Sequence, residues 1–164
     1  MIERILTALE VAVLGLWAGA MAGFAFVFAP IAFRTIPDLS TFGTLVARVM
    51  AALWAFGAGC GALAVVAALG RASARPARGP AVARVALVSV ALAASWYTAN
   101  SIVPRMESIA AQVPGPLDSV PKTDPRRMAY DSEHAASTKV YGTAFLCVLG
   151  ALALAAFGRK PAKG

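Results

Sequence analysis

The sequence predicts an all-α integral membrane protein that folds as one four-helix bundle. Apolar residues make up 59% of the 164 residues and charged residues only 14%, whereas a soluble domain typically carries about 25% charged residues. The charges are concentrated at the ends of four long apolar runs, as in proteins that cross a bilayer. The length suits one domain, so we expect a single four-span transmembrane domain over residues 1–164.

The four apolar runs place the expected spans at about residues 5–33, 45–69, 81–103 and 135–157. A transmembrane helix needs about 20 apolar residues, so the first helix is long enough to tilt or to protrude. The fourth helix is expected to begin before its apolar part, because Asp124 is a good N-cap and Pro125 suits the first helical position. Residues 113–121 contain three prolines and one glycine, which predicts a loop before that helix.

Basic residues near the span ends indicate the orientation in the membrane. One side would hold Arg4, Arg71, Arg75, Arg78, Arg84, Arg159, Lys160 and Lys163. The other side would hold Arg34, Arg48, Arg105, Lys122, Arg126, Arg127 and Lys139. Acidic residues hardly dilute the first side, so we expect both termini in the cytoplasm and the protein in a bacterial inner membrane. The net charge of +7 then reflects attraction to anionic lipid and not a nucleic acid partner.

Small residues recur at four-residue spacing on the first two predicted helices. These small-residue stripes are Gly15, Gly19 and Gly23 on the first helix and Ala51, Ala55 and Gly59 on the second. Helices in lipid associate through close backbone contact, which small residues permit. We expect the two stripes to face each other within the bundle. The alternative is a seam with a second copy of the chain or with other membrane subunits.

A polar face marks the membrane entry of the fourth helix. The only histidine, His134, shares this face with Tyr130, Ser137, Thr138 and Tyr141. Asp131 precedes His134 by three residues, close enough to hydrogen-bond its ring. Polar groups on a membrane helix are expected to face the bundle or a watery cavity. Their expected neighbours are Tyr97, Asn100, Arg105 and Glu107 of the third helix and Arg127 of the fourth.

This polar face suggests an extracytoplasmic pocket in which His134, Asp131 and Glu107 hold a metal ion or a polar ligand. Copper or another divalent metal would be the candidate cofactor, although soft-metal sites usually gather several His, Cys or Met ligands. Heme held by two histidines is excluded, because the chain has one histidine. The alternative is a polar network that caps the bundle and orients the loop.

Glu10 is the one acidic residue inside the first apolar run. It lies one or two turns from the expected helix start, so its carboxylate is expected to snorkel to the membrane interface. The alternative is a role in a proton relay, because ionisable groups within membrane helices often serve transport.

Two groups of residues resemble a known family. The first is the run APIAFR at residues 29–34 followed by Phe42-Gly43, and the second is VPRM at residues 103–106 with Arg127, Tyr130, Asp131, His134 and Ser137. They are similar to a four-helix membrane domain of unknown function that includes transmembrane protein 205 and is distantly related to CopD-type copper-resistance proteins. The resemblance implies four spans, a histidine and a serine that open the last helix, and an association with metal handling. The chain departs from that family at Glu133, where an apolar residue is usual, and near Tyr141, where asparagine is common.

Three functional hypotheses fit these residues. In the first, a small membrane protein handles a metal ion or small solute as a transport or resistance component. In the second, it is a non-catalytic accessory subunit of a larger respiratory or photosynthetic membrane complex, which predicts outward-facing small-residue stripes and no cavity near His134. The third, a membrane-embedded oxidoreductase, has only the four-helix shape in its favour. Catalytic triads and phosphate loops are absent from the sequence, which favours a protein that is not an enzyme.

Overall fold

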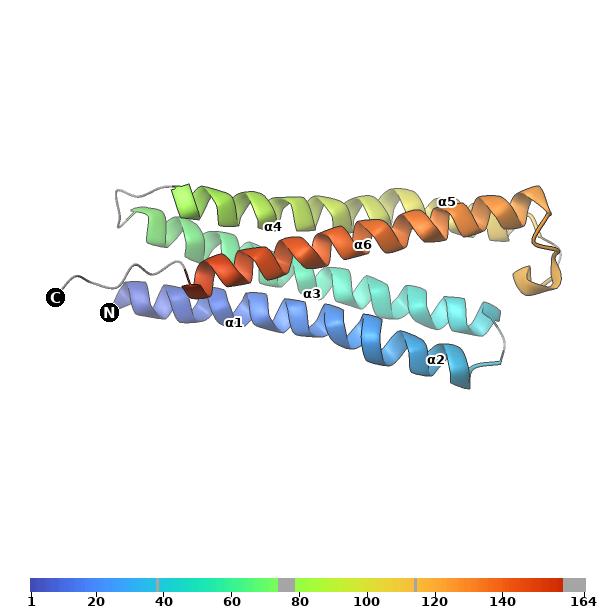
Figure 1. The fold of residues 1–164 in the computed structure, drawn as a ribbon, viewed down its shortest axis with the longest axis horizontal. Helices are drawn as coiled ribbons and strands as arrows, with labels where there is room; N and C mark the ends of the chain where they lie inside the picture. The colour runs from blue at the N-terminus through green and yellow to red at the C-terminus, as the bar shows by residue number, and fades with distance from the viewer. Residues whose placement is uncertain (38, 74–78, 114, 158–164) are drawn as a thin grey trace.

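The computed structural model is a bundle of long helices that run side by side (Figure 1). It describes residues 1–37, 39–73, 79–113 and 115–157, without the side chains of residues 39, 40, 72, 73 and 118. Several basic residues used above to infer the orientation therefore lie outside the described residues, namely Arg75, Arg78, Arg159, Lys160 and Lys163.

Four long helices account for most of the described chain. The first passes through α1 (Ile2–Ala22), η1 (Gly23–Phe28) and α2 (Ala29–Thr35), and the second is α3 (Leu39–Ser73). The third passes through α4 (Gly79–Tyr97), η2 (Thr98–Ile102) and α5 (Val103–Ala110). The short 3-10 helix η3 (Leu117–Ser119) precedes the last helix, α6 (Pro125–Phe157). All four are long and apolar enough to cross a membrane, which confirms the predicted all-α four-helix membrane bundle.

The helices pack as neighbours around a common core. α1 packs against α3 and α6, and α4 packs against the same two helices. The start of α1 lies at the same end of the bundle as the end of α6 (Figure 1). We call this end the terminal end, and the opposite end, which contains α2, α5 and η3, the loop end. Arg4, Arg71 and Arg84 belong to the terminal end, as the sequence predicted.

The predicted N-cap of α6 is confirmed. The backbone N–H of Arg126 donates to Oδ1 of Asp124 over 2.8 Å, and the N–H of Met128 donates to the Asp124 carbonyl over 3.0 Å. The Arg126 guanidinium also donates to both carboxylate oxygens, over 3.1 and 2.8 Å. These side-chain and backbone hydrogen bonds from Arg126 lower the pKa of Asp124 from 3.8 to about 2. The helix therefore begins on an ionised cap over a wide pH range.

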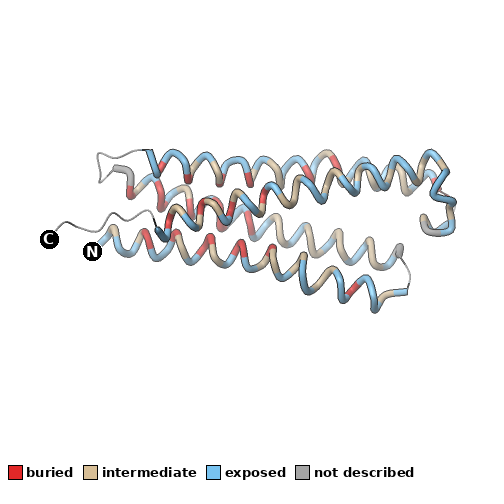
Figure 2. Tube along the Cα trace, in the orientation of Figure 1, coloured by how far each residue is buried: buried red, intermediate tan, exposed pale blue. Residues whose placement is uncertain are grey.

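Buried residues are concentrated toward the terminal end of the bundle (Figure 2). Trp17 and Leu14 of α1 are 1% and 0% exposed, and Val88 of α4 packs in the same core cluster. On α6 the buried residues are spaced by three or four positions, which is the spacing of one helix face, and they are Ala144, Val148, Ala151 and Ala155. Small side chains on α6 thus allow that helix to pack closely against the core.

Two of the long helices change their winding at matching places. The π-helical segment η1 ends directly before α2, whose second residue is Pro30, and η2 ends directly before α5, whose second residue is Pro104. A proline inside a helix removes a backbone donor and clashes with the preceding turn. A wider π-helical turn relieves that clash, and such turns are frequent at functional sites. Both segments lie in the half of the bundle toward the loop end (Figure 1).

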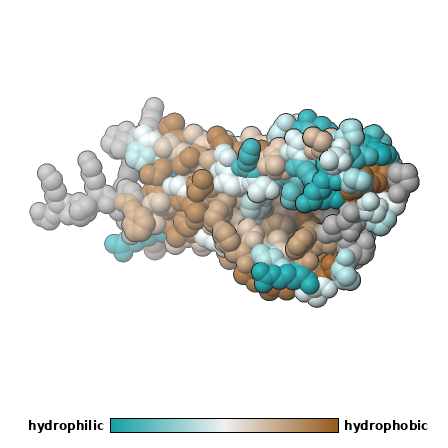
Figure 3. Space-filling view, turned by 45° about the vertical axis from the view of Figure 1, so that its right-hand side comes forward, coloured by the Kyte–Doolittle hydropathy of each residue, from teal (hydrophilic) through white to brown (hydrophobic). Residues whose placement is uncertain are grey.

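The outer surface suits a bilayer. Large apolar side chains are exposed along the helices, including Leu16 at 61%, Phe26 at 71%, Val66 at 65% and Leu146 at 68%. The visible face shows a broad hydrophobic body, with hydrophilic residues gathered toward the loop end (Figure 3). Exposed apolar area of this extent would associate in water, whereas lipid tails cover it without cost. The protein is therefore an integral membrane protein in contact with the lipid bilayer.

Candidate functional site

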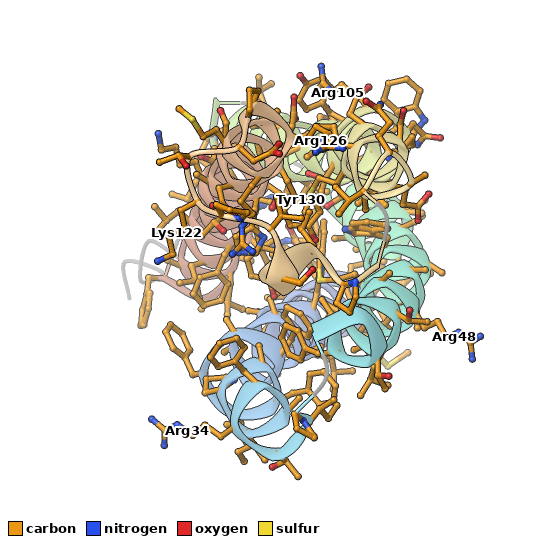
Figure 4. All side chains as sticks on the ribbon, turned by 90° about the vertical axis from the view of Figure 1, so that its right-hand side faces the viewer. Arg34, Arg48, Arg105, Lys122, Arg126 and Tyr130 are labelled. Atoms are coloured by element: carbon orange, nitrogen blue, oxygen red, sulfur yellow. The ribbon has the colours of Figure 1, made fainter. Side chains whose placement is uncertain are left out.

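The predicted polar face of α6 lies mainly at the loop end. Figure 4 looks onto this end and shows Tyr130 of the polar face, together with Arg126 of α6 and Arg105 of α5. Asp131 and His134 are exposed, and so are Tyr97, Asn100 and Glu107 of the third long helix. Tyr130 and Ser137 are half-buried. The structure thus brings these residues to one end of the bundle but leaves most of them at its surface.

Asp131 at the loop end pairs with Arg127 and not with the His134 ring. Nε of Arg127 donates to both carboxylate oxygens of Asp131, over 3.1 and 3.2 Å, one helical turn apart. Arg127 also donates to the Leu117 carbonyl over 2.9 Å, which ties η3 to α6. Asp131 therefore orients Arg127 where the sequence suggested that it would orient the His134 ring. The contact is exposed, so it contributes at most about 1 kcal/mol.

Arg105 links α5 to α6. Its guanidinium lies 3.5 Å from the Glu133 carboxylate, donates to the Tyr97 hydroxyl over 3.1 Å and stands 5.9 Å above the Tyr97 ring. Glu133, the position at which the chain departs from the resembling family, is thus the acidic partner of Arg105. These contacts form a surface network that holds the two helices together at the loop end.

The imidazole of His134 is exposed on α6. The Ser137 and Thr138 hydroxyls donate to the His134 backbone carbonyl, over 2.8 and 3.0 Å, so these two polar groups are satisfied within their own helix. Among the described residues there is no group of three His, Cys, Asp or Glu side chains that could hold a metal ion. The ligand role of His134, Asp131 and Glu107 stays a prediction.

Tyr141 points into the bundle. Its hydroxyl donates to the Met21 carbonyl over 2.8 Å, two residues before η1 begins. Beside it lies a cavity of about 10 Å³, enough for about one water molecule. The lining comes from all four long helices and includes Trp17, Leu53, Ser95, Thr98 and Tyr141. Tyr141 therefore belongs to the middle of the bundle, apart from the polar residues at the loop end.

A buried ionic cluster that was not predicted from the sequence lies at the terminal end. Glu10 of α1 is 1% exposed, and its carboxylate contacts Arg71 of α3 and Arg84 of α4, which are 8% and 5% exposed. One carboxylate oxygen accepts a hydrogen bond from Nη1 of Arg71, and the other lies 2.7 Å from Nε of Arg84. We call Glu10, Arg71 and Arg84 the Glu10 cluster. The prediction that the Glu10 carboxylate snorkels to the membrane interface is wrong, because Arg71 and Arg84 pair with it inside the bundle.

This cluster is expensive to bury. Moving an ion out of water costs several kcal/mol, and an ion pair recovers that cost only with good geometry and further hydrogen bonds. An ionisable residue within a membrane-spanning segment is by default a candidate functional residue. The signal in the sequence was that Glu10 is the one charged residue of the expected span 5–33 and Arg84 the one charged residue of the expected span 81–103, while Arg71 follows the second span closely.

The small-residue stripes face away from the bundle, and the expectation that they face each other is wrong. A Cβ built on Gly15, Gly19, Gly23 or Gly59 would meet nothing within 4 Å. Ala51 and Ala55 are exposed as well. Other glycines make the close contacts: a Cβ on Gly57 would lie 2.5 Å from Nε1 of Trp17, and one on Gly61 would lie 2.9 Å from Leu92.

Comparison with known proteins places the chain in a family. The family described as "Domain of unknown function (DUF4149)" matches residues 12–113, which is more than half of the chain. The chain belongs to this family. The matched region of the DUF4149 chain includes both π-helical segments, Arg71 and Arg84, but neither Glu10 nor α6. No curated protein and no solved structure matches the chain.

Proposed function

We propose that this protein is a non-catalytic accessory subunit of a larger membrane protein complex, respiratory or photosynthetic. The observation that supports it is the outward direction of the two small-residue stripes, on α1 and on α3. Small residues at four-residue spacing let helix backbones approach closely in lipid. The faces that provide such contacts are therefore available to helices of other subunits.

The glycines themselves argue for a partner. Glycine in a helix lowers stability by about 1 kcal/mol relative to alanine. No close contact with the described residues requires glycine at positions 15, 19 and 23, because a Cβ built there would meet nothing within 4 Å. A neighbouring helix that packs against this stripe would offset the cost through dispersion contacts along its length. The same argument applies to α3, where Ala51, Ala55 and Gly59 are exposed.

The two stripes favour an assembly larger than a symmetric dimer. α1 and α3 occupy different corners of the bundle (Figure 4), so their outer faces point in different directions. A twofold dimer uses the same patch on both copies and would leave the other stripe against lipid. A larger complex can cover both.

The orientation belongs to the same proposal. Arg4, Arg71 and Arg84 lie at the terminal end, and by the positive-inside rule we infer that both termini face the cytoplasm of a bacterial inner membrane. A cysteine introduced at Arg4 should then react with a membrane-impermeant thiol reagent only after the cells are opened, and one at Lys122 should react in intact cells. The reverse pattern would overturn this orientation.

The metal hypothesis draws no comparable support from the geometry. It requires His134, Asp131 and Glu107 to converge, whereas Asp131 is engaged by Arg127 and all three side chains are exposed. The kinship with transmembrane protein 205 and copper-resistance proteins likewise stays a prediction. A stoichiometric metal that is lost on His134→Ala would favour this hypothesis over an accessory role.

Native mass spectrometry after gentle extraction at native abundance tests the proposal. We expect co-purification with other membrane subunits in a fixed ratio, and Ala55→Ile should reduce that association by about tenfold because the added bulk separates the helix backbones. Ala93→Ile is the matched control: the same substitution at an exposed position on α4, outside both stripes. A monomer, an assembly of this chain alone, or equal effects of the two variants would overturn the proposal.

A further inference from the structure

The Glu10 cluster carries an unbalanced charge. Glu10 supplies one negative charge, and Arg71 and Arg84 supply two positive charges, so the cluster has a net charge of +1 among largely buried side chains. The nearest acidic residue along α1 is Glu3, in its first turn. Buried charges are normally paired or hydrogen-bonded, because an uncompensated one is costly. The surplus positive charge therefore favours an anion.

Arg84 also has unused hydrogen-bonding capacity. Its Nε lies 2.7 Å from the Glu10 carboxylate but is not aligned for a hydrogen bond, and this buried donor has no other partner among the described residues. A guanidinium offers five N–H donors in a planar fork. One carboxylate is thus shared between two guanidinium groups, and one of their buried donors is left without an aligned acceptor among the described residues.

The depth of the cluster matches a lipid headgroup region. Arg71 lies in the last turn of α3, and Arg84 is five residues from the start of α4. The side chains that face outward at this level are apolar, with Leu69 at 55% and Val82 at 64% exposed. Basic pockets between transmembrane helices near a membrane surface commonly bind anionic headgroups. Apolar surface outside and cationic groups inside suit a molecule with an acyl tail and an anionic head.

We propose that Arg71 and Arg84, held by Glu10, bind one phosphate oxyanion between α1, α3 and α4. Arginine forks match the spacing of phosphate oxygens and form two parallel hydrogen bonds with them. Glu10 acts as a positioning residue, since it fixes both guanidinium groups at one place and lowers their combined charge. The oxyanion comes either from free inorganic phosphate or from the phosphodiester of a phospholipid, and both present the same oxygens.

The full-length protein in a maltoside detergent, which contains no phosphate, allows the two sources to be tested separately. Inorganic phosphate, phosphatidylglycerol and a phosphate-free glycolipid are added in separate titrations, with bound molecules counted by native mass spectrometry. Saturable binding of phosphatidylglycerol but not of the glycolipid or inorganic phosphate assigns a headgroup site. Saturable binding of inorganic phosphate assigns a free-anion site. Binding of neither phosphate probe overturns the proposal.

Substitutions at matched positions locate the site. Arg84→Gln should weaken binding by about tenfold or more, because a hydrogen-bonded charge is lost. Arg4→Gln is the control, with the same change in net charge at an exposed residue of the same end, and it should alter binding by less than about twofold. Arg84→Lys keeps the charge but loses the fork, so it should fold and still bind several-fold more weakly. Binding by Arg84→Lys that equals the wild type would overturn the proposal.

Discussion

In the half of the bundle toward the terminal end, the helices enclose a buried core and the Glu10 cluster, whereas toward the loop end most residues are exposed or half-buried (Figure 2). α1 has seven buried residues, among them Trp17 and Glu10, while α2 has only Ala32 and α5 has none. Contacts between helices therefore hold one half together. In the other half, several polar contacts are local, such as the pair of Arg127 and Asp131 one turn apart.

The two halves are therefore expected to differ in how easily they open. Buried packing and a three-helix ionic contact favour cooperative opening with a high free energy, and exposed local contacts favour easy opening. The two π-helical segments lie in the half with fewer buried residues, and one residue separates each of them from Pro30 or Pro104. The loop half is thus the part of the bundle expected to open more easily, while the packed terminal half keeps the helices in register.

The largest effect is expected from Glu10→Gln. Removing the carboxylate leaves two buried guanidinium groups without their counter-ion, and breaking a buried ion pair costs about 3–5 kcal/mol. Glu107→Gln is the control at an exposed position of the loop half, where we expect a change within about 0.5 kcal/mol. Reversible unfolding of the two variants in mixed micelles measures the difference. Equal effects would mean that the terminal half does not depend on its ionic cluster.

A second comparison uses two neighbouring glycines of α3. Gly57→Ala places a methyl group 2.5 Å from Nε1 of the buried Trp17 ring, so the ring must move. Such overpacking lowers the free energy of unfolding by about 1–3 kcal/mol. Gly59→Ala meets nothing within 4 Å and improves helix propensity, so it should leave the stability unchanged or raise it slightly. Thermal unfolding of the detergent-solubilised protein reports both. If Gly59→Ala is the more harmful change, the outward direction assigned to that stripe is wrong.

A smaller effect is expected where the two halves meet. Tyr141→Phe removes the hydrogen bond to the Met21 carbonyl just before η1, and such a bond contributes about 1 kcal/mol. The phenyl ring keeps the packing, so the loss should appear as faster amide hydrogen exchange around η1 more than as global unfolding. Unchanged exchange in η1 would show that the hydroxyl does not couple α6 to the π-helical turn.

The four spans could be predicted because composition alone decides that a run of apolar residues enters lipid. The start of α6 was predictable too, since Asp124 and Pro125 act on the adjacent backbone. The direction of the glycine stripes was not. In water the apolar face of a helix turns inward, but a helix in lipid can be apolar on every face, as α1 is. The regular spacing therefore shows that Gly15 and Gly19 lie on the same face, but it does not show in which direction that face points.

Polar residues would have given the direction. Glu10 lies with Trp17 and Met21 on the buried face of α1, and Arg71 lies with Gly57 and Ala64 on that of α3, so each ionisable group marks the inner side. Their pairing could not be inferred, because Arg71 is 61 residues from Glu10 and only the folded bundle brings them together. The polar face around His134 could be predicted from the sequence. The partner of Asp131 could not, because Arg127 and His134 both lie within reach of Asp131 on α6 and the spacing does not show which of them binds it.

The smallest effect concerns the loop end in acid. Hydrogen bonds from Arg126 lower the pKa of Asp124 from 3.8 to about 2, so ionised Asp124 stabilises the start of α6 above pH 4, and this contribution is lost as the pH falls toward 2. Amide exchange in the first turn of α6 should therefore be more protected at pH 5 than at pH 2.5, after correction for intrinsic exchange rates. Asp124→Asn should abolish most of this pH dependence while keeping a neutral cap. If amide exchange in the first turn of the wild-type protein does not depend on pH, the loop half does not rely on the Asp124 carboxylate. The two halves would then differ in packing alone.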